Sequence, residues 1–260
     1  MTLRLPARSA PFRLSTGTVH PLCVYGTAFK EDRTGELKAL ALKKGFRGVD
    51  SANYPSAYEE SSVRVAIEEV CKPGLLPSGR TTESKLPCNA DQPLEEQVRE
   101  SIEQSFQNLK IDYMDALLLH VPFEDEQDDT VAWHVMESFV PSRVGVLGVS
   151  NSSRAALEKL YTAATVKPEV VQNRFQEENE YDADIREYLD KTGIVYQVFS
   201  LLKANQEIRS SELVARVAER FYTVGEIVFY MLVLGSGKVS IAASDLTEYL
   251  AEFKQLLRIK

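Results

Sequence analysis

The stretch GVDSANYPSAYEES, residues 48–61, places a carboxylic acid and two phenols close together in the chain. Asp50 ends a short apolar run, and Tyr54 and Tyr58 follow within the next eight positions. Two further ionisable groups end later runs, because Lys85 follows TTES and His120 follows LLL. An acid, a phenol, an ammonium and an imidazole are side chains that general acid–base catalysis uses. Taken singly, each also has an ordinary reading as a turn, surface or core residue.

The elements that must position these groups follow a regular order, in which short apolar runs alternate with amphipathic helical patterns. The apolar runs cover residues 21–26, 46–52, 81–87, 114–121, 143–151, 169–175, 194–202 and 238–244. The helical patterns cover residues 34–45, 59–70, 93–109, 130–140, 153–164, 182–193, 210–221 with 226–234, and 245–257. Alternation predicts parallel strands joined by helical crossovers.

Eight such units in one chain predict a single (β/α)8 barrel domain over residues 1–260, with a short irregular segment at residues 1–20. A doubly wound open sheet is the structural alternative. That fold normally carries a glycine-rich phosphate turn after an early strand, and the sequence contains neither GxGxxG nor GxxxxGK. The barrel is therefore the expected fold.

In a barrel, polar groups at the carboxyl ends of the strands point into one mouth. The expected strands end at Asp50, Lys85, His120, Ser150–Asn151 and Phe199–Ser200, and Gln172–Asn173 lie in the sixth strand. Three of these positions are ionisable and come from consecutive strands. Their joint order, more than any one residue, predicts a shared site.

These motifs resemble the aldo-keto reductase family, over about residues 25–221. The resemblance is carried by YGTAFK, GFRGVDSA, SKLP, LEEQVRESIEQSFQNLKIDYMDALLLHVP, VLGVSN, KPEVVQNRF and GIVYQVFSLL. Members of that family fold as (β/α)8 barrels, bind NADPH without a Rossmann domain and reduce aldehydes or ketones. They do so with a tetrad of Asp, Tyr, Lys and His.

By motif position, the resemblance assigns the acid to Asp50, the lysine to Lys85 and the histidine to His120. The family's tyrosine commonly stands five positions after the acid, where this chain has Pro55. Some fungal and bacterial members have a longer loop that places the tyrosine just before a Glu-rich helix start. SAYEESSVRVAI resembles that version, so Tyr58 is the expected proton donor and Tyr54 the alternative.

Carbonyl reduction needs these groups because hydride delivery builds negative charge on the carbonyl oxygen. A phenol at its reference pKa of about 10 is a poor acid at neutral pH, and a nearby ammonium eases loss of its proton. For the NADP(H) cofactor, the resemblance implies that Ser150, Asn151 and Gln172 bind the nicotinamide carboxamide. It also implies that Phe199 stacks on the nicotinamide ring and that the backbone at Ser200 and Leu202 meets the pyrophosphate.

The C-terminal part departs from the family pattern. Members generally carry a loop near the eighth strand that ends in Arg or another basic group and holds the adenosine 2′-phosphate. The corresponding stretch here, LGSGKVSIAASDLTEYLAEF, has Lys238 before the expected strand and no Arg at the start of the last helix. Asp245 would repel a 2′-phosphate. The choice among NADPH, NADH and no cofactor therefore stays open.

Composition limits the other partners. The chain has 44% hydrophobic residues, 26% charged residues and a net charge of −8, with the acids spread along the chain. This balance disfavours nucleic acid and anionic membrane surfaces, and no apolar run reaches membrane-spanning length. The three cysteines lack CxxC spacing, so a reducing, cytoplasmic location is expected, and no residue cluster has metal-ligand spacing. A monomer is the default expectation.

The leading hypothesis is an NADPH-dependent reductase that acts on a small or medium aldehyde or ketone. Secondary metabolites are among the substrates considered. A redox-neutral isomerase, dehydratase or cyclase that uses Tyr58 and Lys85 is an alternative, because the phosphate loop is eroded. A Schiff-base aldolase built on Lys85 and a non-catalytic binding barrel are the remaining alternatives.

Overall fold

The computed structural model describes residues 13–30, 33–64, 80–84, 92–235 and 239–242, the strands at 80–84 and 239–242 by their backbone alone. Eight parallel strands pair in chain order, and the last pairs with the first, so the sheet closes into a barrel. The strands are β1 (Cys23–Gly26), β2 (Gly48–Ala52), β3 (Arg80–Ser84), β4 (Met114–Leu119), β5 (Val144–Ser150), β6 (Val170–Arg174), β7 (Val195–Phe199) and β8 (Val239–Ala242). The expected (β/α)8 barrel is confirmed, and the open sheet is excluded.

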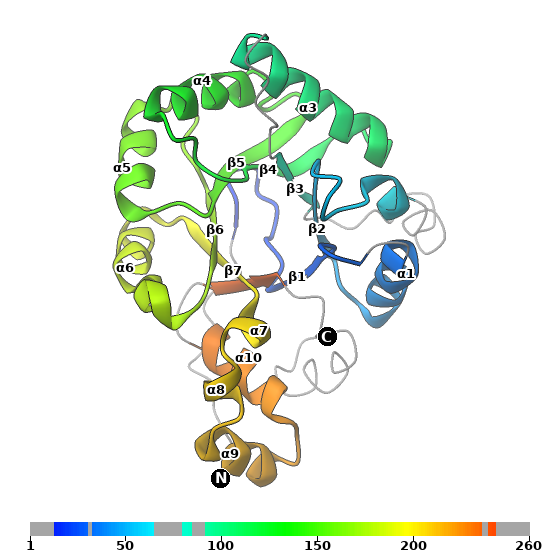
Figure 1. Cartoon of the computed structure of the whole chain (residues 1–260), viewed down its shortest axis with the longest axis vertical. Helices are drawn as coiled ribbons and strands as arrows, with labels where there is room; N and C mark the ends of the chain where they lie inside the picture. Colours follow the sequence, from blue (N-terminus) through cyan, green and yellow to red (C-terminus); the bar gives the residue numbers. More distant parts are fainter. Residues whose placement is uncertain (1–12, 31–32, 65–79, 85–91, 236–238, 243–260) are drawn as a thin grey trace.

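Helices surround the barrel in Figure 1, and α9 lies farthest from the strands. The helices are α1 (Thr34–Lys44), α3 (Leu94–Leu109), α4 (Glu126–Glu137), α5 (Arg154–Ala163), η2 (Glu177–Asp182), α6 (Ala183–Thr192), α7 (Leu201–Ala204), α8 (Gln206–Arg209), α9 (Glu212–Phe221) and α10 (Gly225–Leu234). Gly45 and Gly193 end α1 and α6 with φ of 107° and 79°, a left-handed conformation that glycine adopts without a Cβ clash. None of the described helices is both long and apolar enough to cross a membrane.

Two helix boundaries differ from the sequence expectation. The helix expected at 130–140 begins at Glu126, because the side chain of Asp125 accepts a hydrogen bond from Gln127 N and acids fill the first turn. The segments 210–221 and 226–234 form two separate helices, since Tyr222 adopts a φ of 53° and ends α9. The last expected helix, residues 245–257, lies outside the described residues.

Side-chain alternation along the strands separates two buried layers. Leu118, Val146, Val170 and Val195 pack together with Leu14. Their neighbours one position along each strand belong to the larger cluster that packs beneath the helices: Leu117, Leu119, Leu147, Val171 and Tyr196. Because the side-chain period is two, residues in step with Val170, such as Gln172 and Arg174, face the barrel interior, whereas Asn173 faces the helices.

The N-terminal residues of the described chain cover one end of the barrel. Arg13 and Val19 form an antiparallel bridge, and Leu14 is buried in the interior cluster. Ser15 donates from its backbone N to Glu169 Oε2 at 2.7 Å, just before β6 begins. The end of the barrel from which the strands start is therefore closed, and the opposite end is the one available for a site.

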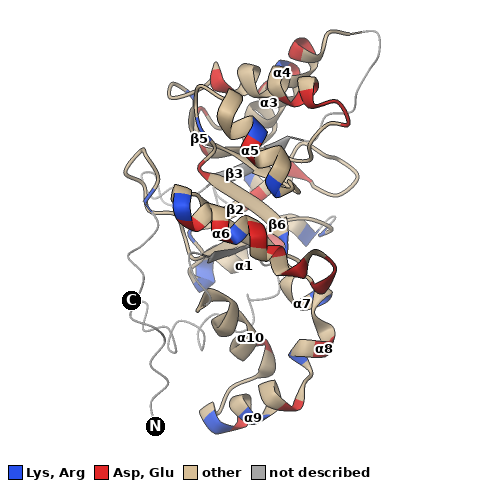
Figure 2. Ribbon diagram, turned by 90° about the vertical axis from the view of Figure 1, so that its left-hand side faces the viewer, with Lys and Arg blue, Asp and Glu red and all other residues tan. Residues whose placement is uncertain are grey.

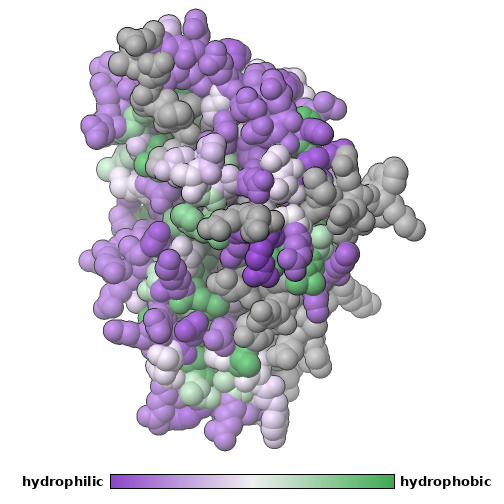
Figure 3. Space-filling model, turned by 45° about the vertical axis from the view of Figure 1, so that its right-hand side comes forward, coloured by the Kyte–Doolittle hydropathy of each residue, from purple (hydrophilic) through white to green (hydrophobic). Residues whose placement is uncertain are grey.

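Charges of both signs are interspersed on the surface. Figure 2 shows acidic and basic residues side by side along α5 and α6. On the face in Figure 3, hydrophilic residues predominate and hydrophobic ones form small separate groups. On these two helices, acidic and basic side chains pair with one another, as Arg154 does with Glu158 and Lys191 with Glu187.

Candidate active site

Asp50 occupies the interior face of β2 and is buried, with 4% of its surface exposed. Gln172, on β6, donates from Nε2 to Asp50 Oδ1 at 3.2 Å, a contact between strands that are not neighbours in the barrel. The backbone carbonyl of Asp50 accepts hydrogen bonds from Thr27 N and Thr27 Oγ1. Hydrogen bonds therefore hold Asp50 both at its side chain, through Gln172, and at its backbone, through Thr27.

Burial raises the pKa of Asp50 to about 7, even though the hydrogen bond from Gln172 acts in the opposite direction. A carboxylate loses hydration when it is buried, and a neutral amide donor replaces only some of that loss. An adjacent cation would stabilise the charged form more strongly. Such a cation would be well placed beside this carboxyl group.

Lys85 is the residue expected to supply that cation, and its side chain lies outside the described residues. It directly follows Ser84, the last residue of β3, which pairs with Leu119 at the end of β4. In the same ladder, Ala52 of β2 pairs with Glu83. Lys85 therefore follows a strand that ends between the strands of Asp50 and His120.

Tyr54 and Tyr58 both approach His120, the residue that follows β4. The ring centroids lie 6.4 Å from His120 for Tyr54 and 6.1 Å for Tyr58, with interplanar angles of 72° and 82°. Such edge-to-face contacts are a favourable arrangement of aromatic rings. Tyr58 N donates to Tyr54 O at 2.9 Å, which folds the loop so that both phenols lie near the same imidazole.

Ser150, Asn151 and Gln172 lie together at the carboxyl end of β5, where its ladder with β6 ends. Ser150 and Gln172 pair in the ladder and are both buried. Asn151 is exposed and has a φ of 53°, so the chain leaves the sheet there. Its Nδ2 donates to His120 O at 2.9 Å and to Ser150 Oγ at 3.1 Å. The amide-rich group thus adjoins the histidine.

Phe199 ends β7 and is half-buried on the interior face, followed by Ser200 with a φ of 54°. Ser200 precedes α7, whose Leu202 has a buried side chain, so any ligand contact of Leu202 would come from its backbone. A residue that the sequence reasoning missed is Arg174, whose guanidinium lies 5.5 Å from the centre of the Phe199 ring. The signal was present, because Arg174 stands two positions after Gln172 on the same strand face.

Two further residue sets bear on ligands. Among the residues that the structure describes, no group of three or more His, Cys, Asp or Glu side chains lies together as a metal site. Lys238 and Asp245, which the sequence analysis placed near the adenosine phosphate, lie outside the described residues. The described residues therefore include those that the sequence analysis assigned to the nicotinamide and exclude those that it assigned to the adenosine phosphate.

The sequence is similar to that of known proteins over most of its length. The model of the family described as the aldo/keto reductase family matches residues 13–206. Glyoxal reductase of Bacillus subtilis is 30% identical over 191 residues, which cover 73% of this chain and 64% of the relative. An uncharacterized oxidoreductase of the same organism, YtbE, is 30% identical over 211 residues, which cover 79% of this chain and 71% of the relative. The chain thus spans just under two thirds of the first of these relatives.

Solved structures agree in fold. The aldose reductase of Schistosoma japonicum superposes with a TM-score of 0.78 at 19% identity, covering 97% of this chain and 88% of that one. An aldo-keto reductase from a deep-sea metagenome library superposes with a TM-score of 0.79 at 22% identity, covering 95% and 89%. Because the family model matches most of its length, the chain belongs to the aldo/keto reductase family.

Proposed function

We propose that this protein is an NADPH-dependent reductase of small or medium aldehydes and ketones. The observation that carries the proposal is the 3.2 Å hydrogen bond between Gln172 of β6 and Asp50 of β2 on the barrel interior, together with the Tyr58 ring 6.1 Å from His120, the residue that follows β4. The phenol and the imidazole lie beside each other, and the acid lies on the interior face of a neighbouring part of the barrel, which supports a shared site. Glyoxal reductase, a relative by sequence, has a name that points to small carbonyl substrates.

In the proposed reaction, Tyr58 gives a proton to the carbonyl oxygen of the substrate. The ammonium of Lys85 favours loss of that phenolic proton, and Asp50 holds the ammonium in place. His120 donates a hydrogen bond to the same oxygen and orients the substrate. NADPH, when bound, supplies the hydride to the carbonyl carbon.

The residues present suit the nicotinamide end of that cofactor. The carboxamide group needs both hydrogen-bond donors and acceptors, and Ser150, Asn151 and Gln172 provide them. Phe199 offers a flat ring on the interior face of β7, against which a nicotinamide ring can stack. The preference for NADPH over NADH is part of the proposal and depends on residues beyond the described chain.

The test measures the consumption of NADPH by its absorbance, for the wild type and for Lys85→Met. The substrates are a panel of aldehydes, ketones and small dicarbonyls. We expect turnover by the wild type and a loss of about 10²- to 10⁴-fold in Lys85→Met, the usual contribution of acid–base catalysis. Lys191→Met, a change at an exposed lysine of α6, is the control for loss of a positive charge. Equal turnover by wild type and Lys85→Met would exclude the mechanism, and carbonyl conversion without NADPH consumption would favour a redox-neutral enzyme.

A further inference from the structure

The loop that follows Ser150 is held by a side chain from the next strand. The β5–β6 ladder ends at the Ser150–Gln172 pair, and the left-handed Asn151 turns the chain away. Ser152 is buried, so its backbone groups need partners. The Asn173 amide supplies both, since Oδ1 accepts from Ser152 N at 3.0 Å and Nδ2 donates to Ser152 O at 2.9 Å.

Asn173 is itself held by a buried carboxylate. Its Nδ2 donates to Asp182 Oδ2 at 2.7 Å, and Tyr196 OH donates to the same oxygen at 2.9 Å. Burial raises the pKa of Asp182, while the two donors lower it. Because Asn173 and Tyr196 face the helices, this network lies behind the barrel wall and outside the mouth.

The backbone that leads to Asp182 has a strained conformation. Glu180, Tyr181 and Asp182 have φ values of 51°, 55° and 51°, three successive left-handed residues that are not glycine. Each such residue costs on the order of 1 kcal/mol or more, so the conformation persists only where contacts determine it. Arg186 Nε donates to Tyr181 O at 2.9 Å and is one such contact, and the bonds to Asp182 are others.

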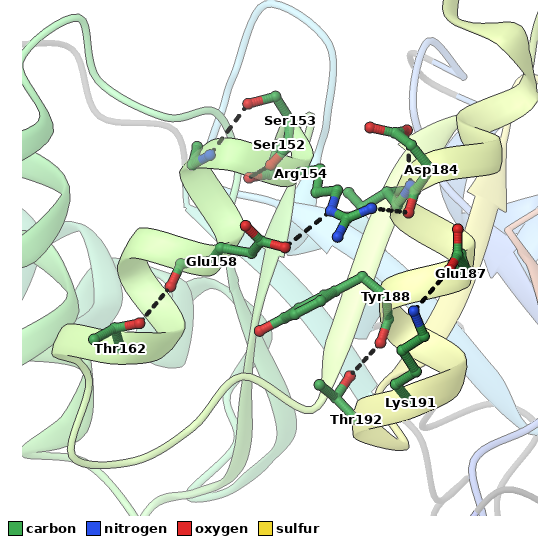
Figure 4. A network of polar contacts seen from close by, with 12 residues as sticks. Ser152, Ser153, Arg154, Glu158, Thr162, Asp184, Glu187, Tyr188, Lys191 and Thr192 are labelled. Atoms are coloured by element: carbon green, nitrogen blue, oxygen red, sulfur yellow. Dashed lines mark hydrogen bonds and ion pairs between the residues drawn. The ribbon is translucent and has the colours of Figure 1, made fainter.

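The outer side of the same loop is also fixed, as Figure 4 shows. Ser153 caps α5 by accepting from Ala156 N at 3.2 Å. Arg154 donates to Glu158 Oε1 at 2.9 Å and to Asp184 O at 3.4 Å, which joins α5 to the first turn of α6. The loop 151–153 is therefore held on the inner side by Asn173 and on the outer side by Arg154.

We propose that Asn173, Asp182 and Tyr196 are positioning residues that hold the loop after β5 and thereby aim Ser150 and Asn151 at the nicotinamide carboxamide. The proposal rests on the proposed function, and none of the three needs to touch the cofactor. The physical basis of the proposal is that hydrogen bonds from surrounding residues keep ligand-binding groups in the geometry that binding requires. Loosening Ser152 would let Asn151, one residue away, leave its place beside His120.

The test measures binding of two ligands to the full-length protein by calorimetry: NADPH, and adenosine 2′,5′-bisphosphate, which lacks the nicotinamide. We expect Asn173→Ala to weaken NADPH binding about tenfold, the equivalent of one or two hydrogen bonds, and to leave the bisphosphate dissociation constant within about twofold. Tyr196→Phe, which removes one hydroxyl and keeps the ring, should weaken NADPH binding less, by about threefold.

Asn108→Ala is the matched control, because Asn108 Nδ2 also donates to a buried carboxylate, Glu60, at 3.0 Å but on α3. It should leave both dissociation constants unchanged. Unchanged NADPH binding in both Asn173→Ala and Tyr196→Phe would overturn the inference, as would an equal loss for both ligands, which indicates general destabilisation. If the wild type binds the bisphosphate but not NADPH, or binds neither, the proposed function fails together with the inference that rests on it.

Discussion

Gln172 and Asp50 are joined across the barrel by a 3.2 Å hydrogen bond, although 122 residues separate them in the chain. One residue is the proposed carboxamide ligand and the other the proposed acid of the tetrad. Their contact places the two functions in one layer of the barrel interior. A change at either residue is therefore expected to affect both cofactor binding and proton transfer.

Replacement of Gln172 by Met should weaken NADPH binding about tenfold, because a buried amide that bonds the carboxamide is lost. Calorimetric titration of the variant measures this. Gln197→Met is the matched control, since Gln197 pairs with Gln172 in the ladder but lies on β7 and is also buried. Weaker binding in Gln197→Met alone would contradict the assignment of Gln172.

The two tyrosines can be separated by removing one hydroxyl at a time. Tyr58→Phe should lower kcat by at least about 10²-fold, because the proton donor is lost while the ring remains against His120. Tyr54→Phe should keep most of the activity. The measurement is kcat under saturating NADPH and aldehyde. The reverse pattern would assign proton donation to Tyr54, whose ring lies at a similar distance from His120.

Asp50 should make stability depend on pH. Burial raises its folded pKa to about 7, above the unfolded value near 4, so the folded state binds the additional proton between those values. The contribution of Asp50 to the free energy of unfolding is therefore largest below about pH 4. This contribution falls by at most about 4 kcal/mol as the pH rises to about 7. Asp50→Asn should lack this part of the dependence.

Urea unfolding of wild type and Asp50→Asn at several pH values between about 4.5 and 8 measures the difference. The stability of the variant relative to wild type should grow as the pH rises. Lys85→Met should show a steeper fall than the wild type, because the ammonium proposed to stabilise the carboxylate is gone. A difference between wild type and Asp50→Asn that stays constant with pH would show that the pKa of Asp50 is not raised.

Gly148 should be intolerant of a side chain. A Cβ there would lie 2.5 Å from Val170 O and 3.0 Å from Leu118 Cγ, on a strand buried on both faces. Gly148→Ala is expected to cost about 1–3 kcal/mol or more through overpacking, measured as a fall in the urea midpoint. Gly26→Ala, on β1, should stay close to wild type, because no atom of the residues that the structure describes lies within 4 Å of the added Cβ.

The alternation of apolar runs and amphipathic helices was sufficient to predict the barrel, because each parallel strand needs a helical crossover of its own. Side-chain alternation similarly predicts that Asp50, Gln172 and Phe199 face one interior. Local signals were weaker at helix ends. Asp125 starts α4 earlier than the apolar pattern suggests, since capping depends on one hydrogen bond and not on periodicity.

By itself, the sequence determined the order of strands and helices and therefore which polar side chains near the barrel mouth are candidates for chemistry, although β2 continues two residues past the expected end at Asp50. Only the tertiary structure decided that Tyr54 and Tyr58 both approach His120, and that Asn173 joins Ser152 to Asp182. These relationships depend on ring placement and on left-handed turns at Asn151 and Asp182. Asn and Asp tolerate a left-handed conformation better than most residues, but long-range contacts decide that it is adopted at these two positions once the barrel has closed.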